Sequence, residues 1–256
     1  MIFESHAHYN DEAFNEDRDL LLNSMRENGV KYVLDIGTTI EESKKSIALA
    51  KKYPFVYAAI GVHPDEVGEL TLEKIEWLKK QCDYEKVVAI GEIGLDYYWD
   101  KQSHEIQKKW FVAQLDLAKE KDLPIVIHSR DAAADTLEIL KANKNDKVRG
   151  VMHCYSYSLE MAREYVKMGF YIGVGGVVTF KNGRRLQETV SDIPLDRILL
   201  ETDCPYLSPE PNRGKRNSSL NIPFIAEKIA DIKGITYEEV VKVTNENAKK
   251  LFFEGR

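Results

Sequence analysis

The sequence lacks several features that would each point to a particular class of protein. It has only 3 cysteines among 256 residues and no Cys-x-x-Cys pair. This argues against a disulfide framework and favours buried, reduced thiols in a cytoplasmic protein. No apolar run reaches the roughly 18 residues of a membrane-spanning helix. The opening residues, Met-Ile-Phe-Glu-Ser-His, have no basic region before an apolar run, so we expect neither a signal peptide nor a membrane partner.

The chain also lacks an excess of positive charge. Its net charge is −6, which offers no general attraction for nucleic acid or for an anionic membrane, so any polyanion must be bound by local groups of Lys and Arg. It contains no low-complexity segment and no linker, and its composition of 43% hydrophobic and 30% charged residues is that of a globular protein with a sizeable core. We expect one domain over residues 1–256, without an obligate protein partner.

Short apolar runs alternate with amphipathic stretches along most of the chain. The runs are Ile2–Phe3, Tyr32–Ile36, Val56–Ile60, Val87–Ile90, Ile125–Ile127, Gly150–Met152, Tyr171–Val174 and Ile198–Leu200. In the clearest helical stretch, residues 105–121, the stripe Ile106, Trp110, Ala113 and Leu117 opposes a Lys/Glu face. Eight such repeats predict a TIM (β/α)8 barrel. An extra C-terminal helix is expected over residues 236–253, with Thr236 as N-cap and Glu239 completing a capping box.

Polar side chains follow most of these predicted strands at the point where each strand ends. They are His6, His8, His63, Glu92, His128, His153, Glu201 and Asp203. The carboxyl ends of barrel strands open onto one face, where barrel active sites lie. Five of the six histidines fall there, which scattered core histidines would not do.

His6 and His8 are two residues apart, so on a strand they share a face and can converge on one ion. Four more potential ligands stand at equivalent strand ends: Glu92, His128, His153 and Asp203. One ion rarely takes six protein ligands and keeps an open position, whereas two bridged ions would use them naturally. We assign His6, His8 and Asp203 to one ion, His128 and His153 to the other, and Glu92 to the bridge.

A pair of divalent ions indicates hydrolytic chemistry at a phosphoryl or carbonyl centre. The ions would lower the pKa of a shared water, and Asp203 would take its proton. Imidazoles suit Zn²⁺, whereas phosphoryl chemistry and carboxylates suit Mg²⁺ or Mn²⁺, so the native metal stays open. A structural zinc site is a poor alternative, because such sites are usually closed, four-coordinate and often rich in cysteine.

Other residues are candidates for supporting roles around the ions. His63 is expected to contact substrate, although a turn-forming histidine before Pro64 is a competing interpretation. Glu201 could orient a histidine ligand. The loop containing Arg213 and Arg216 is basic, and Tyr97, Tyr98 and Trp99 follow Glu92 closely. Cations beside aromatic rings suit single-stranded nucleic acid, though solvated loops and ordinary packing would give the same pattern.

Seven ordered motifs resemble those of the TatD family of metal-dependent hydrolases. They are His6-Ala-His8, Ile60-Gly-Val-His-Pro64, Ile90-Gly-Glu-Ile-Gly-Leu-Asp96, Pro124-Ile-Val-Ile-His-Ser-Arg130, Met152-His-Cys154, Leu200-Glu-Thr-Asp-Cys-Pro-Tyr-Leu207 and Arg213-Gly-Lys-Arg-Asn217. The resemblance implies a TIM barrel and a metal-dependent DNase, typically a 3′–5′ exonuclease on single-stranded DNA ends, using Mg²⁺, Mn²⁺ or Zn²⁺. It implies the same ligand set, with His63 as a phosphate contact.

The sequence departs from the family pattern at Glu4, where the family usually has Asp. Glu4 shares a strand face with His6 and His8, so its longer side chain could shift the first ion or reach it. The alternative function is hydrolysis of a carbonyl ester or amide, such as a lactone or an aminoacyl-tRNA ester, which the same two ions would serve equally well.

Overall fold

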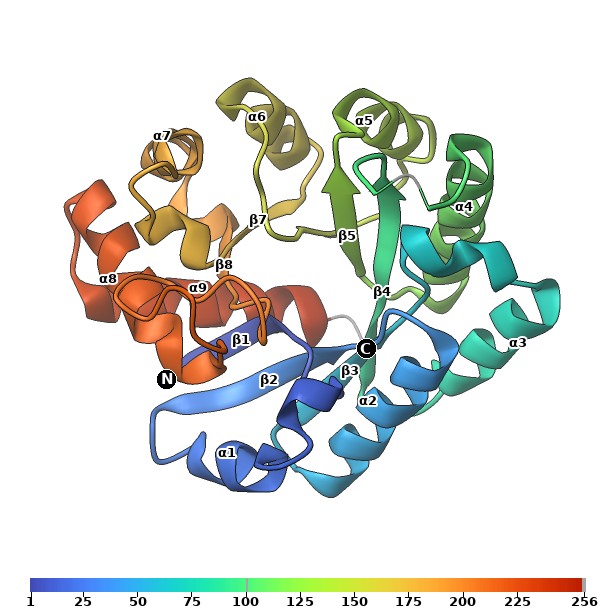
Figure 1. The fold of residues 1–256 in the computed structure, drawn as a ribbon. Coiled ribbons are helices and arrows are strands. Elements are labelled where there is room, and N and C mark those ends of the chain that lie inside the picture. The colour runs from blue at the N-terminus through green and yellow to red at the C-terminus, as the bar shows by residue number, and fades with distance from the viewer. Residues whose placement is uncertain (100, 255–256) are drawn as a thin grey trace. The chain divides into compact units, whose positions relative to one another are not determined.

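The computed structural model describes residues 1–99 and 101–254. In it, eight strands form one sheet in the order β1 to β8, and helices connect them in the alternation expected of a (β/α)8 barrel (Figure 1). The paired strands run parallel, for example β4 with β5 and β7 with β8. The chain divides into two compact units, Met1–Asp35 with Cys154–Arg256 and Ile36–His153.

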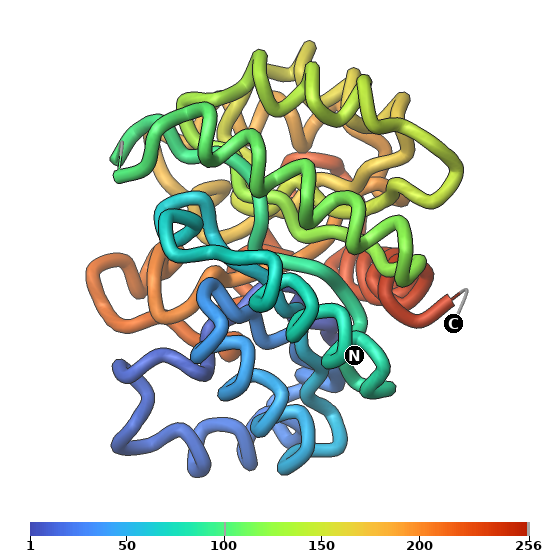
Figure 2. Tube along the Cα trace, turned by 90° about the vertical axis from the view of Figure 1, so that its right-hand side faces the viewer, coloured from blue at the N-terminus to red at the C-terminus, as the bar shows by residue number. Residues whose placement is uncertain are grey.

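The unit Ile36–His153 contains four strands and the helices between them. The strands are β3 (Val56–Ile60), β4 (Val87–Asp96), β5 (Ile125–Arg130) and β6 (Gly150–Met152), and the helices are α2 (Ile40–Lys52), α3 (Leu72–Gln81), α4 (His104–Lys121) and α5 (Ala133–Ala142), with the 3₁₀ helix η2 (Pro64–Glu69) after β3. Helix α2 packs on β3 and α4 packs on β4. Figures 1 and 2 show these helices on one side of their strands.

The other unit joins the two ends of the chain. Its strands are β1 (Ile2–Ala7), β2 (Val30–Ile36, whose last residue opens the other unit), β7 (Tyr171–Val174) and β8 (Ile198–Leu200); its helices are α1 (Arg18–Ser24), α6 (Leu159–Lys167), α7 (Arg184–Asp192), α8 (Ile222–Lys233) and α9 (Tyr237–Phe252), with 3₁₀ turns at Glu12–Phe14, Gly176–Thr179, Leu195–Arg197 and Ser219–Asn221. The first and last strands are neighbours, with a parallel bridge between Ala7 and Cys204. Helix α9 packs on both of them.

Local capping explains where several helices begin. Thr39, Thr71, Ser103 and Ser158 each accept a hydrogen bond from a backbone N–H in the first turn of α2, α3, α4 and α6. The predicted N-cap Thr236 does the same for α9 by accepting the N–H of Glu239 at 3.2 Å.

The predicted runs at β3, β6, β7 and β8 match the observed strands, whereas β1, β4 and β5 extend beyond the predictions through polar residues. In β4, glycines permit the extension. A Cβ on Gly91 would lie 2.6 Å from Cβ of Val126, and one on Gly94, whose φ is +147°, would lie 1.9 Å from the carbonyl oxygen of His128. Strand β4 therefore runs closer to β5 than side chains at these positions would allow.

The apolar stripe predicted for α4 is partly wrong. Trp110 and Leu117 are buried, but Ile106 is 40% exposed. The buried face includes Gln107 and Gln114, because their side-chain amides pair with the backbone of Asp96, the last residue of β4, and of Val62, in the loop after β3. An apolar periodicity cannot reveal a buried face that contains hydrogen-bonded amides.

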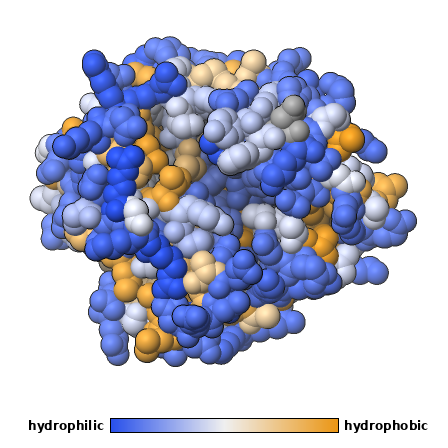
Figure 3. Space-filling view, in the orientation of Figure 1, coloured by the Kyte–Doolittle hydropathy of each residue, from blue (hydrophilic) through white to orange (hydrophobic). Residues whose placement is uncertain are grey.

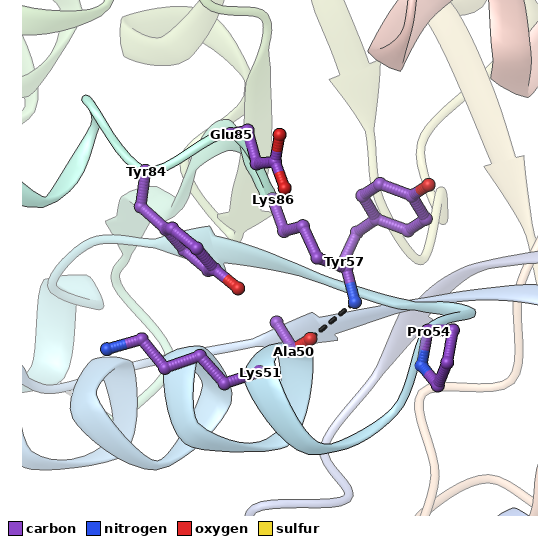
Figure 4. A pocket seen from close by; sticks show the side chains of 7 residues that line it. All are labelled: Ala50, Lys51, Pro54, Tyr57, Tyr84, Glu85 and Lys86. Carbon is purple, nitrogen blue, oxygen red and sulfur yellow. Dashed lines mark hydrogen bonds between the residues drawn. The ribbon is translucent and has the colours of Figure 1, made fainter.

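At the N-terminal ends of β3 and β4, a surface pocket lies between Pro54, Tyr57, Tyr84 and the end of α2 (Figure 4). Lys86 crosses this pocket, and its Nζ donates hydrogen bonds to the carbonyl oxygens of Ala50 and Tyr53. The face of the protein seen in Figure 3 is predominantly hydrophilic. None of the helices in the described ranges is long and apolar enough to cross a membrane.

Candidate metal-binding clusters

Imidazoles and carboxylates gather at the carboxyl ends of strands in each unit. The β1/β8 cluster consists of Glu4, His6, His8, Glu201 and Asp203. The β4/β5 cluster consists of His63, Glu92, Asp96, His128 and His153. Within each unit, the parallel strands deliver these side chains to the same end of the sheet.

In the β1/β8 cluster, three predicted ligands converge. The Nε2 atoms of His6 and His8 are 3.1 Å apart. Oδ1 of Asp203 lies 3.5 Å from the first and 3.4 Å from the second. His6 is on β1 and His8 just beyond it, so strand alternation places both on one side.

Asp203 reaches the histidines because of its backbone. Its N–H donates to the carbonyl oxygen of His6 at 3.0 Å, and its φ is +58°. Aspartate tolerates this left-handed conformation better than most residues. The turn after β8 therefore directs this carboxylate back toward the end of β1.

Glu4 is fully buried, and its carboxylate binds backbone and hydroxyl groups. Oε1 accepts the N–H groups of His6 at 3.1 Å and Thr202 at 3.0 Å, and Oε2 accepts the Thr202 hydroxyl at 2.6 Å. Burial raises the pKa of Glu4 to about 7, although the hydrogen bond from Thr202 opposes that shift. Glu4 thus joins the end of β1 to the segment that carries Asp203.

Glu201 is fully buried beside these ligands. One of its oxygens lies within 4.8 Å of a ring nitrogen of His6. Its Oε1 accepts the N–H of Cys154 at 2.5 Å. Its predicted role in orienting a histidine ligand stays a prediction.

In the β4/β5 cluster, one carboxylate oxygen serves two histidines. Oε1 of Glu92 is 2.7 Å from Nδ1 of His128 and 3.0 Å from Nε2 of His153. Glu92 is 3% exposed. A carboxylate so enclosed and shared by two imidazoles is a suitable ligand for a cation.

His63 meets the same glutamate at a longer distance. Its Nε2 is 3.8 Å from Oε1 of Glu92, and its ring packs edge-on against His128 with centroids 4.3 Å apart. Its Nδ1 accepts the N–H of Asp65, and burial, with the nearby His128, lowers its pKa to about 3. His63 is therefore neutral with its proton on Nε2, and this N–H can donate to a substrate oxygen. Its side chain also caps η2, as the turn-forming interpretation expects, and its contact with substrate stays a prediction.

Asp96 belongs to this cluster and was not predicted. Its Oδ2 is 2.9 Å from Nε2 of His128, and its Oδ1 accepts the N–H groups of Tyr98 at 2.9 Å and Trp99 at 3.1 Å. Burial opposes ionisation of Asp96, but these hydrogen bonds outweigh it and lower its pKa to about 2. The sequence could have indicated Asp96, because Glu92, Gly94 and Asp96 are two residues apart and therefore lie on the same face of β4.

Asp96 and Glu92 together hold a proton on each nitrogen of His128. Burial lowers the pKa of this imidazole, but the two carboxylate hydrogen bonds overcome burial and raise it to about 9. In this state His128 would carry a positive charge. A metal cation bound at Nδ1 would take the place of the proton there and would supply a positive charge in its stead.

The donor sets of both clusters fit a divalent ion. His6, His8 and Asp203 bring one ligand atom each within 4.8 Å of the others. In the β4/β5 cluster, Oε1 of Glu92 lies 2.7 Å from a ring nitrogen of His128 and 3.0 Å from one of His153. Nitrogen and oxygen donors without thiolate suit Zn²⁺, Mn²⁺ or Mg²⁺ in an open site.

The predicted substrate-binding arginines differ in their surroundings. Arg213 is half-exposed, with its guanidinium 4.2 Å from the ring centre of Phe180 and 4.0 Å from Glu210. Arg216 instead forms a two-point ion pair with Asp17 and donates to the carbonyl oxygen of Ala13 at 2.7 Å. Arg213 is the better placed of the two for contact with a phosphate.

Comparisons with known proteins agree with this arrangement. The family described as TatD related DNase matches residues 3–253. The metal-dependent hydrolase YabD of Bacillus subtilis, described as uncharacterized, is 46% identical over 98% of this chain and 99% of its own. YcfH of Escherichia coli, described in the same words, is 36% identical over 98% of this chain and 96% of its own. The crystal structure of YjjV, a TatD homologue from Escherichia coli, superimposes with a TM-score of 0.92 at 30% identity, covering 98% and 97% of the two chains.

Proposed function

Because the chain belongs to the TatD family and is a metal-dependent hydrolase with a TIM-barrel fold, we propose that it is a deoxyribonuclease. Its substrate would be the phosphodiester bond next to the end of a single DNA strand, cleaved in the 3′–5′ direction. The family description and the two clusters of imidazole and carboxylate groups support this proposal.

The proposed ligands follow the clusters. His6, His8 and Asp203 would hold one ion, and His128 and His153 a second. The bridge through Glu92 stays a prediction from the sequence. When bound, such ions supply a water of lowered pKa and stabilise negative charge on a phosphoryl oxygen.

The protein's own groups would do the remaining work. Asp203 keeps 17% of its side chain exposed and can accept a proton from water at Oδ1. His63 presents the N–H at Nε2 as a hydrogen-bond donor to a substrate oxygen. Arg213, half-exposed over Phe180, can contact the phosphate of the next nucleotide.

The observation that carries the proposal is the Glu92 carboxylate held between His128 and His153. We therefore expect an end-labelled single-stranded oligonucleotide to release mononucleotides when Mg²⁺, Mn²⁺ or Zn²⁺ is added to metal-free protein. Glu92→Gln should reduce the rate at least about 100-fold, because an amide cannot replace a carboxylate ligand.

Glu138→Gln provides the matched control, because Glu138 is exposed on α5. It should cleave at the wild-type rate. Protein that retains its ions but releases no nucleotide with any metal would contradict the proposal. The position of the label in the product gives the polarity of cleavage.

Hydrolysis of a carbonyl ester or amide is the second candidate function. The pairing of Arg216 with Asp17 favours it, because this pairing occupies a cation that a nucleic-acid site would use. A lactone or aminoacyl-ester substrate would be cleaved by protein that leaves the oligonucleotide intact, and its rate would be insensitive to loss of Arg213.

A further inference from the structure

We propose that Asp96 is a positioning residue that keeps a proton on Nε2 of His128 and so leaves Nδ1 as the metal-ligating atom. This inference rests on the proposed role of His128 as a ligand. It adds to the site a residue that contacts neither the ion nor the substrate.

The two nitrogens of His128 face different carboxylates. Nδ1 faces Glu92 at 2.7 Å, and Nε2 faces Asp96 at 2.9 Å. A neutral imidazole has one N–H and one bare nitrogen, and only the bare nitrogen can bind a metal. Because an ionised Asp96 can only accept, it requires the proton at Nε2.

Asp96 itself cannot turn away from His128. Its other oxygen accepts the two loop N–H groups of Tyr98 and Trp99. Its backbone N–H and C=O are each paired at 2.8 Å with the side-chain amide of Gln107 on α4. Asp96 is 1% exposed. Two hydrogen bonds thus hold the carboxylate and two more hold the backbone of Asp96, so the orientation of the imidazole is set by β4 and α4 rather than by the ion alone.

This geometry makes Asp96→Asn informative. The amide oxygen must face the two loop N–H groups, since an NH₂ there would meet two donors. The amide NH₂ then faces His128 and donates to Nε2. The imidazole proton is forced to Nδ1, where it blocks the ligand atom.

We expect Asp96→Asn to weaken Zn²⁺ binding about 10- to 100-fold, measured by competition with a chelator. Two-bond ¹H–¹⁵N spectra of the Zn²⁺-loaded wild type should show the His128 proton on Nε2, with the signal assigned by its loss in His128→Gln. In Asp96→Asn that proton should move to Nδ1. Asp96→Glu, which keeps an acceptor, should restore the Nε2 proton.

Asp135→Asn is the matched control. Asp135, on α5, accepts a hydrogen bond from the hydroxyl of Tyr97, which neighbours Tyr98 in the loop after β4. It also forms an ion pair with Lys108. Its replacement should leave Zn²⁺ affinity within about twofold of wild type.

Two results would overturn the inference: Zn²⁺-loaded wild-type protein whose His128 is protonated at Nδ1, or a folded Asp96→Asn that binds Zn²⁺ as tightly as wild type. The wild-type spectrum decides the matter even where Asp96→Asn does not fold. Protein that binds Zn²⁺ in this manner but cleaves no DNA would contradict the proposed function alone.

Discussion

Glu4 shows how one residue can support a ligand cluster through the backbone. It stands where the TatD pattern usually has Asp, and it is fully buried. Its longer side chain could shift the first ion or reach it, which stays a prediction. In the structure the carboxylate binds the main chain of His6 and Thr202. Its extra length spans from β1 to the segment after β8.

We expect Glu4→Ala to lower the free energy of unfolding by about 2–6 kcal/mol, because it leaves two buried N–H groups without an acceptor at roughly 1–3 kcal/mol each. Glu4→Gln keeps the accepting oxygen and can donate to the Thr202 hydroxyl, so it should cost much less. Urea unfolding of metal-free protein measures both. Equal losses in the two variants would show that the charge, rather than the acceptor oxygen, provides the stability.

Candidate ligand residues could be named one by one from the sequence, whereas the contacts that Gln107 and Asp96 make were missed. His6, His8 and Asp203 stand at the ends of apolar runs, and their chemistry marks them. Gln107 acts by pairing with the backbone of Asp96 at the end of β4, and Asp96 acts through its contact with Nε2 of His128 on β5. The geometry of those contacts depends on how closely the strands approach, which a single sequence does not encode locally.

At the scale of elements, helix α2 is held at its C-terminus by a side chain from another segment. Lys86, just before β4, donates to the carbonyl oxygens of Ala50 and Tyr53. The last carbonyls of a helix have no partner within it, and a cation there is favoured by the helix dipole. This contact also fixes the connection from α2 to β3 against β4 (Figure 4).

Lys86→Met should therefore destabilise the protein by about 1–3 kcal/mol through loss of two hydrogen bonds from a charged donor. Lys45→Met, on the exposed face of α2, should change stability by no more than about 0.5 kcal/mol. Thermal unfolding measures both. Because Lys86 precedes the first residue of β4 whereas Glu92 lies in the second half of that strand, hydrolysis by folded Lys86→Met should match wild type, and a lower rate would contradict this separation of roles.

Element types were easier to predict than element ends. The alternation of apolar runs and amphipathic stretches predicts the observed order of strands and helices, and the strand order with the match to YjjV confirms the barrel fold class. The ends of β1, β4 and β5 were missed because these strands continue through Glu, His and Asp. A hydrophobic run predicts which residues are buried, whereas backbone hydrogen bonds between neighbouring strands define where a strand ends. The two boundaries differ where a strand continues through buried polar residues whose side chains are hydrogen-bonded.

For the molecule as a whole, the charge balance constrains how DNA could bind. A net charge of −6 repels a polyanion at long range. Binding must then rely on a few cations near the site, and the ion pair of Arg216 with Asp17 reduces their number. Arg213 becomes the most informative position on the rim.

Arg213→Ala should raise KM for single-stranded DNA with little change in kcat, because a phosphate contact contributes to ground state and transition state alike. The slope of log K against log salt should fall in magnitude by about 0.7, as expected for one contact to a single strand. Arg216→Ala should instead mainly lower stability. An unchanged salt slope in Arg213→Ala would indicate that the phosphates are bound elsewhere.

The two buried glutamines of α4 bear on how this enzyme can be modified. Gln107 and Gln114 are two turns apart, and each side-chain amide pairs with the N–H and C=O of one residue, Asp96 and Val62 respectively. Each amide thus makes the two hydrogen bonds that a residue of a neighbouring strand would make with that backbone. A loop transplanted from a relative after β3 or β4 would find this template only if α4 came with it. In directed evolution or chimera design, these loops and this helix should be exchanged as a single cassette.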